Sequence, residues 1–421
     1  MSNSLIKYYD IFVPGGYPKY TYNPRETLEL EEKVNSVLEN LCKLVVVTGH
    51  TKSGKTVLVQ KILPRESAAW IDGGGITTED DFWSTLLDQL DLFQTTTETR
   101  ADTVSGSVNS EANASGGIVV AKAGVKLGAK FEGTKSEAQA QTRIVSSRSA
   151  ALVGLRNLRT PLVIDDFHYL PKELQGNIVR ALKPLIFDGI PVVVIAIPHR
   201  RYDAIKVEKE MTGRILSLTV PRWSSDELGF IPSTGFSLLN KNVSNEVFIK
   251  LANESIGSPH LMQEFCREIC KTRLNIDQSL ASLKATNLDE ILIETAETTI
   301  GRPIFEKLAR GPRQRSDRIQ RTLKSGEKVD IYGLVLAGLA HIKPELITLE
   351  YEDLRTAIRE ICMPENVPNV QEVARVLKHM AEISATDESS TPVIDFDEEE
   401  KVLHITDPFF AFYLRWGRIF S

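Results

Sequence analysis

Short, unbroken apolar runs mark the first half of the chain. Residues 44–47, 162–164 and 192–197 are such runs, and a segment with helical character, residues 57–63, follows the first of them. Continuous apolar runs of this length are typical of parallel strands that are covered on both faces, whereas half-exposed strands alternate between apolar and polar positions. The pattern therefore predicts an α/β domain built on a parallel sheet within residues 1–222.

A different pattern begins near residue 330. Helical periodicity at residues 331–341, 349–362 and 370–383 is followed by two short strand-like runs at 392–396 and 402–405. Three helices followed by a hairpin are the order of a winged-helix domain, which we predict over residues 330–421 with the third helix in the recognition position. The aromatic residues of the closing segment, 407–416, recur at helical spacing and are predicted to be core.

The α/β region is interrupted by an insertion at residues 94–140. Residues 95–117 are rich in Thr, Ser, Ala and Gly and are predicted to be a flexible loop. Residues 118–131 then alternate between small apolar residues and lysine or glycine, which is the period of a strand. Such a ribbon could contact DNA, associate with copies of itself, or have no partner, and its apolar edge favours self-association.

Residues 49–56, Gly-His-Thr-Lys-Ser-Gly-Lys-Thr, match the phosphate-binding pattern G-x-x-x-x-G-K-[ST] without a departure, between a predicted strand and a predicted helix. In this context backbone N–H groups and a helix N-terminus surround an anion. Lys55 is expected to reach the terminal phosphates of ATP, and the Thr56 hydroxyl to hold Mg²⁺. The residues expected to bind the nucleotide here are Gly49, His50, Thr51, Lys52, Ser53, Gly54, Lys55, Thr56 and Val57.

Two acids, Asp165 and Asp166, end the apolar run at 162–164, in the form of a Walker B strand. Parallel strands carry such residues to the carboxyl edge of the sheet, where ligands of open α/β sheets bind. Asp165 is predicted to orient Mg²⁺, and Asp166 to polarise the attacking water. The alternative is that the two acids cap the next helix.

Together these motifs resemble the AAA+/STAND-type P-loop ATPases, close to the origin-recognition-like group. The resemblance spans roughly residues 15–275 and includes the entry segment around Arg25, whose backbone lies against the adenine in that family. It also includes Gly257-Ser258-Pro259, which is similar to the G-x-P motif in which the proline packs near the nucleotide. The resemblance implies an ATPase core followed by a helical lid at residues 223–300, with Arg25 and Pro259 binding the nucleotide.

The family pattern assigns further roles. His199, after the strand that follows the Walker B acids, is the nearest match to a residue that senses the terminal phosphate. Arg214 stands directly before another apolar strand, the usual place of an arginine finger, although it is equally suited to a surface ion pair. Two departures are that His260 stands near the usual sensor arginine, and that Asp-Asp replaces the common Asp-Glu. The shorter second acid implies a slow or partner-stimulated ATPase.

Composition narrows the class of protein. The 421 residues are 42% apolar and 25% charged, which is typical of globular proteins. We expect a cytoplasmic protein without a membrane span, because there is no apolar run of eighteen residues, no signal peptide and no cysteine framework. The net charge is −6, but the segment predicted as a basic linker, 301–329, is rich in arginine between 302 and 328. That segment could bind DNA or an acidic protein, or be a solvated helix.

The primary hypothesis is a molecular switch that binds and hydrolyses ATP. Its nucleotide state would control how the lid and the winged helix pack. It would also control either self-assembly, through Arg214 and residues 118–131, or the binding of a partner. The resemblance implies roles such as defence against mobile elements or transposition-type assembly. One alternative is an initiator-like DNA-binding ATPase, although the acidic wing tip at 397–400 would repel phosphates and favours a protein partner. The second alternative is a scaffold that binds ATP without hydrolysing it.

Overall fold

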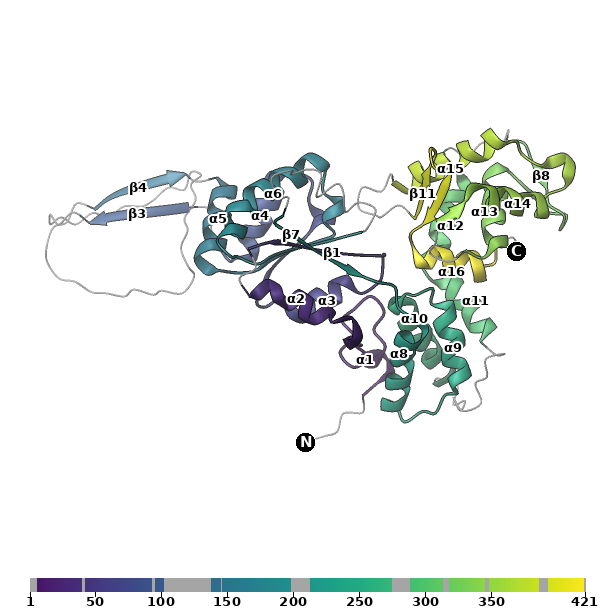
Figure 1. Ribbon diagram of the computed structural model, residues 1–421, viewed down its shortest axis with the longest axis horizontal. Helices are drawn as coiled ribbons and strands as arrows, with labels where there is room; N and C mark the ends of the chain where they lie inside the picture. Colours follow the sequence, from purple (N-terminus) through teal and green to yellow (C-terminus); the bar gives the residue numbers. More distant parts are fainter. Residues whose placement is uncertain are drawn as a thin grey trace. The chain divides into compact units, whose positions relative to one another are not determined.

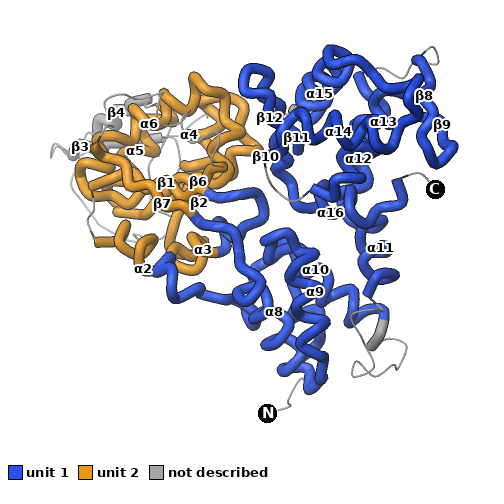
Figure 2. The backbone as a smooth tube through the Cα atoms, turned by 45° about the vertical axis from the view of Figure 1, so that its right-hand side comes forward, with its two compact units in different colours: residues 1–30, 49–57, 220–421 blue, residues 31–48, 58–219 orange. Residues whose placement is uncertain are grey.

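A computed structural model describes residues 6–39, 42–92, 95–101, 138–144, 146–197, 213–274, 288–312, 318–344, 348–385 and 393–419. Its contacts divide the chain into two compact units (Figure 2). Unit 1 comprises residues 1–30, 49–57 and 220–421, and unit 2 comprises residues 31–48 and 58–219. The phosphate-binding loop is therefore grouped with the C-terminal half of the chain.

Unit 2 is built on a five-stranded sheet in the order β2-β5-β6-β1-β7. Figure 1 labels β1 and β7 of this sheet. The strands are β1 (Leu44–Gly49), β2 (Ala69–Asp72), β5 (Leu162–Asp165), β6 (Val192–Ala196) and β7 (Ile215–Val220). The pairs β1–β6, β5–β6 and β2–β5 are parallel. All six residues of β1 and all five of β6 are buried, which explains their unbroken apolar character. The predicted α/β fold with a parallel sheet is confirmed.

Helices complete the layers of this unit. A hydrophobic core joins the sheet to α4 (Glu79–Gln89), α5 (Ser147–Leu158) and α6 (Lys172–Phe187), with Trp83 and Phe82 among its largest fully buried side chains. Two further helices, α2 (Leu30–Asn35) and α3 (Lys55–Ile62), begin in unit 1 and continue into unit 2.

The described ends of the insertion correct one prediction. Residues predicted as the start of a flexible loop instead form β3 (Thr95–Ala101), which pairs antiparallel with β4 (Ala138–Ile144). The sequence Thr-Thr-Thr-Glu-Thr-Arg-Ala is rich in β-branched residues, which favour strands, but its partner lies about forty residues away in the sequence and is not visible locally. The predicted strand at 118–131 lies outside the described residues.

Unit 1 begins with α1 (Tyr8–Ile11) and continues through α8 (Ser225–Leu238), α9 (Asn245–Glu254), α10 (Pro259–Ile269), a π-helical turn (Cys270–Leu274), α11 (Asp289–Thr298) and α12 (Gly301–Arg310). The final elements are α13 (Ile331–Ile342), α14 (Tyr351–Ile361), α15 (Val370–Ala385) and α16 (Pro408–Trp416). A short ribbon, β8 (Arg321–Thr322) with β9 (Lys328–Val329), precedes α13.

The C-terminal elements have the predicted winged-helix order. The helices α13, α14 and α15 are followed by the wing β11 (Ile394–Asp397) and β12 (Val402–Ile405), and β12 also pairs with β10 (Thr348–Glu350). One hydrophobic core spans the predicted lid and the winged helix, because Phe265 of α10 packs on Phe412 of α16 with ring centroids 4.9 Å apart. The predicted core role of the closing aromatics is therefore confirmed, while the domain bounds stay a prediction.

Candidate functional site

The phosphate-binding loop joins the end of β1 to the start of α3, as its sequence predicts. A Cβ atom on Gly49 would lie 2.8 Å from the carbonyl oxygen of Val220 and 2.9 Å from Ser53 Oγ, so a side chain does not fit there. Gly54 adopts φ +89°, a backbone conformation that glycine reaches at no steric cost. The two glycines of the motif thus permit the close approach and the turn that an anion-binding loop requires.

The ammonium group of Lys55 lies within the loop itself. Lys55 is the first residue of α3, and its Nζ donates to the carbonyl oxygens of Gly49 at 3.0 Å and His50 at 2.9 Å. The side chain is buried, with Thr56 and Val57 half-buried beside it in the first turn of α3. The geometry brings a cation and a helix N-terminus to the same loop, which is the arrangement that binds phosphates.

The Walker B acids end β5. Asp165 is buried, and its Oδ1 accepts a hydrogen bond from the backbone N–H of Asp166 at 3.0 Å. Asp166 precedes a short 3-10 helix in a left-handed conformation, yet its side chain makes no capping hydrogen bond to that helix. Since β5 and β1 both run parallel to β6, which lies between them, β5 and β1 end at the same edge of the sheet.

Asp72 is a neighbour of this pair that sequence reasoning missed. It ends β2 in register with Asp165, and its Oδ1 accepts from the backbone N–H of Gly74 at 2.9 Å. The sequence gives only a weak indication of this strand, the short apolar run Ala-Ala-Trp-Ile that ends in Asp72 before three glycines.

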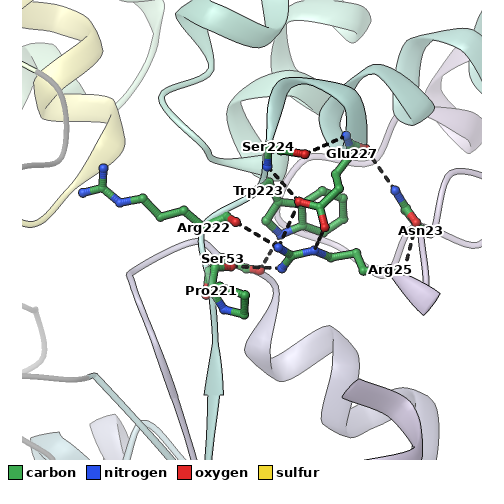
Figure 3. A network of polar contacts seen from close by, with 8 residues as sticks. All are labelled: Asn23, Arg25, Ser53, Pro221, Arg222, Trp223, Ser224 and Glu227. Atoms are coloured by element: carbon green, nitrogen blue, oxygen red, sulfur yellow. Dashed lines mark hydrogen bonds and ion pairs between the residues drawn. The ribbon is translucent and has the colours of Figure 1, made fainter. Parts of the chain in front are cut away.

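Arg25 is the centre of a buried polar network, shown in Figure 3. Its guanidinium forms an ion pair with Glu227, with Nε 2.8 Å from Oε1 and Nη2 3.0 Å from Oε2. The same group donates to the carbonyl oxygens of Pro221 and Arg222, both at 2.9 Å, and lies over the Trp223 ring at 4.9 Å. The side chain of Arg25 thus fastens the entry segment to the segment that precedes α8, while its predicted backbone contact with adenine stays a prediction.

Glu227 is held by more than this ion pair. It forms a capping box with Ser224, whose Oγ accepts from the Glu227 N–H while Glu227 Oε2 accepts from the Ser224 N–H at 2.7 Å. Burial raises the pKa of the Glu227 carboxyl, but hydrogen bonds from Arg25 and Ser224 outweigh burial, and the net pKa is lowered. The spacing Ser-x-x-Glu was the one sequence signal that could have identified Glu227.

The start of α10 contacts the phosphate loop. Ser258 caps this helix, Pro259 occupies its first turn, and Ser258 Oγ donates to the carbonyl oxygen of Lys52 at 3.4 Å. His260 packs edge-to-face on Phe409 of α16, with ring centroids 4.9 Å apart. Burial, with a smaller contribution from the charge of Lys52, lowers the pKa of His260 to about 4, so this imidazole is neutral at pH 7.

Asp407 caps the closing helix of the winged-helix domain. Its Oδ1 accepts from the Phe410 N–H at 2.9 Å and so caps α16. Burial raises the pKa of the Asp407 carboxyl, while the nearby positive charge of Lys52 acts in the opposite direction. The contact between Ser258 and the Lys52 carbonyl oxygen, which joins α10 to the phosphate loop, was not foreseen from the sequence.

Two further predicted site residues do not take part in the contacts given above. Arg214 is exposed at the start of β7, and its guanidinium lies over the ring of Phe187 at 5.5 Å. Its role as a finger stays a prediction. His199 lies outside the described residues.

The predicted basic segment makes several ion pairs within the chain. Arg302 pairs with Glu297 and Glu306, Arg318 pairs with Asp330, and Arg321 pairs with Glu372. On the predicted recognition helix, Lys378 pairs with Glu398 of the acidic wing, and Tyr332 shares a hydrogen bond with His379. These contacts reduce the positive charge that the surface offers to a nucleic acid.

The oxygen donors predicted for the metal, Thr56 and Asp165, are of the kind that Mg²⁺ uses. Among the residues that the structure describes, no group of three or more His, Cys, Asp or Glu side chains could hold a metal ion. Mg²⁺ is usually bound by one or two protein oxygens together with water and substrate phosphates, and the Thr56 hydroxyl and the Asp165 carboxylate are donors of that kind.

Across the same described residues, no helix has the length and hydrophobicity needed to cross a membrane.

No family model matches the chain, and no curated protein matches its sequence. Solved structures do match its fold. The ORC2 protein of Aeropyrum pernix, solved in ADPNP–ADP complexes, is 13% identical with a TM-score of 0.50, and the match covers 96% of this chain and 95% of that one. A Walker-type ATPase of Pyrococcus abyssi is 15% identical with a TM-score of 0.50, covering 92% of this chain and 94% of that one. The chain therefore has the fold of the origin-recognition-like AAA+ P-loop ATPases, with a C-terminal winged-helix domain.

Proposed function

We propose that this protein is an ATP-binding molecular switch that hydrolyses ATP slowly. The main support is the phosphate loop, in which a crowded Gly49, a left-handed Gly54 and the buried ammonium of Lys55 meet at the start of α3. The similar fold of the Aeropyrum ORC2 protein, solved with ADPNP and ADP, also supports this proposal.

In the proposed site, Lys55 binds the terminal phosphates in place of the two loop carbonyls that it now contacts. Thr56 and Asp165 would hold Mg²⁺, which when bound would supply positive charge next to the transferred phosphoryl group. Asp166 orients the attacking water, and Arg214, presented by a neighbouring subunit or domain, stabilises the transition state. His199 senses the terminal phosphate, while Pro259 and the backbone of Arg25 face the nucleotide.

Lys52 supports the coupling of nucleotide to the winged helix. Its carbonyl oxygen accepts from Ser258 Oγ at the cap of α10, and His260 of α10 packs on Phe409 of α16, all within unit 1. A phosphate bound in the loop adds negative charge beside Lys52 and so changes the contact between the loop and α10. The nucleotide state then alters the packing of the lid and the winged helix, which is a known route for switching.

Loss of the loop lysine tests nucleotide binding. At a concentration one hundred times Kd, ATP should stabilise the wild-type protein by about 2.7 kcal/mol. The variant Lys55→Ala should show no ATP-dependent rise in Tm, whereas the control Lys61→Ala, on the exposed face of the same helix, should keep it. An unchanged ATP effect in Lys55→Ala would show that the nucleotide binds elsewhere.

Turnover is tested separately. The variant Asp166→Asn should bind ATP with wild-type affinity but release phosphate at least about tenfold more slowly, because a neutral amide polarises water poorly. The control Asp188→Asn removes a surface carboxylate that pairs with Arg156 and should leave turnover unchanged. Equal rates for Asp166→Asn and wild type would remove Asp166 from this role. If neither protein hydrolyses ATP with any partner, the chain is a nucleotide-bound scaffold.

DNA binding is the rival function. The ion pairs of Arg302, Arg318 and Arg321 disfavour it, because their charges are already engaged within the chain. Anisotropy titration of labelled duplex DNA at two salt concentrations, with ATP present, distinguishes the two functions. We expect no binding at low salt; an affinity that falls steeply as salt rises would instead support the initiator-like function.

A further inference from the structure

Two successive carbonyl groups of the phosphate loop are hydrogen-bonded by residues of the predicted lid. The indole Nε1–H of Trp223, just before α8, donates to the Ser53 carbonyl oxygen at 2.9 Å (Figure 3). Ser258 Oγ, at the start of α10, donates to the preceding carbonyl, that of Lys52. All four residues belong to unit 1, so these contacts lie within one compact body.

The bond from Trp223 fixes the direction of an amide group. No described peptide bond is cis, and in a planar trans peptide the C=O and the following N–H point in opposite directions. Because the Ser53 carbonyl is directed at the indole, the N–H of Gly54 is directed away from it. Gly54 N–H belongs to the set of backbone donors that a loop of this pattern presents to phosphate. Trp223 thus binds the carbonyl side of the Ser53–Gly54 peptide, and the amide on its opposite side is suited to bind an anion.

Trp223 is itself firmly positioned. The Arg25 guanidinium covers its ring at 4.9 Å, and Arg25 is 5% exposed and bound to Glu227. The Trp223 backbone N–H donates to the carbonyl oxygen of Gly257 at 3.4 Å, immediately before the cap of α10. A change in the lid that moved Trp223 would therefore release the Ser53–Gly54 peptide to rotate.

We propose that Trp223 is a positioning residue for the phosphate loop, which fixes the Gly54 amide for a nucleoside di- or triphosphate and so couples lid docking to nucleotide affinity. The inference rests on the proposed nucleotide binding. Coupling of this kind is reciprocal, so bound nucleotide also strengthens the contact between the loop and the lid. Trp223 makes its contribution through Ser53 and Gly54 and need not contact the nucleotide.

A pair of tryptophan variants tests this. Trp223→Phe keeps an aromatic ring beneath Arg25 but removes the Nε1–H donor. Trp416→Phe is a matched control, because Trp416 also donates Nε1–H, to Glu254 at 2.7 Å, and also lies beneath a cation, Lys250. Calorimetric titration with ADP and with ATP should give a Kd for Trp223→Phe that is roughly three- to tenfold weaker than wild type, the loss expected for one hydrogen bond. Trp416→Phe should stay within about twofold.

Indole fluorescence gives a second readout that a general loss of stability would not change. Trp223 is one of four tryptophans in the chain. Because bound nucleotide strengthens the contact between the loop and Trp223, the emission of wild type and of Trp416→Phe should change on titration with ADP. That change should be lost in Trp223→Phe. If Trp223→Phe does not fold, the absence of an ADP-dependent emission change in the other two proteins would overturn the proposal. Equal affinities for Trp223→Phe and wild type would also overturn it. Failure of wild type to bind either nucleotide would instead reject the proposed function.

Discussion

Acidification should destabilise the folded chain through His260. This imidazole packs on Phe409, and burial together with the charge of Lys52 lowers its pKa to about 4. Burial raises the pKa of the Asp407 carboxyl, at the start of α16, and the charge of Lys52 opposes this effect. Protonating His260 in the folded chain places a second cation beside Lys52 in a poorly solvated position.

The sign and the size of this effect follow from the two pKa values. The folded value lies below the ordinary value of 6.5, so the unfolded chain binds more protons between them. The contribution of neutral His260 is fully present above pH 6.5 and is lost as the pH falls from 6.5 toward 4. At pH 5 the loss is about 2 kcal/mol, from roughly 1.5 pH intervals at 1.36 kcal/mol each.

Urea denaturation of wild type and His260→Gln at pH 7.5 and pH 5 measures this contribution. Glutamine does not titrate, so the free energy of unfolding of wild type should fall between the two pH values by about 2 kcal/mol more than that of the variant. Asp407 and the other carboxyl groups titrate in both proteins, and their effects cancel in the comparison. Identical pH dependence in the two proteins would refute the claim that His260 is buried as a neutral group beside Lys52.

Two further substitutions probe the site. Arg25→Met should destabilise the folded chain by about 3 kcal/mol, because it leaves Glu227 partly buried without its cation. The control Arg302→Met breaks an exposed ion pair and should cost less than about 1 kcal/mol. Equal midpoints of the two variants in a thermal melt would contradict this difference. Gly49→Ala should destabilise by roughly 1–3 kcal/mol and weaken ATP binding, because the new methyl would lie 2.8 Å from the Val220 carbonyl oxygen. A variant that melts like wild type and binds ATP equally well would show that the loop has room for a side chain.

Local pattern predicted the elements whose cause lies within a few residues. Residues 49–56 join β1 to α3 as expected, with Gly49 ending the strand and Lys55 beginning the helix, because both the turn and the helix start are encoded in that octapeptide. The helices predicted at 331–341 and 370–383 agree with α13 and α15 to within two residues. Asp165 ends β5 because an apolar run followed by an acid specifies where a buried strand must stop.

Contacts between distant segments were decided only by the tertiary structure. Trp223 lies 170 residues from Ser53, and Arg25 lies 202 residues from Glu227, so no local period links either pair. Arg302 looked like a free cation in the sequence, yet it pairs with two glutamates once α11 and α12 pack. The sequence by itself thus determined the phosphate loop, the parallel sheet and the winged-helix order, since each follows from periodicity and backbone conformation. Which side chains brace that loop depends on how the lid packs, because a hydrogen bond forms only when packing brings its donor and acceptor within about 3 Å.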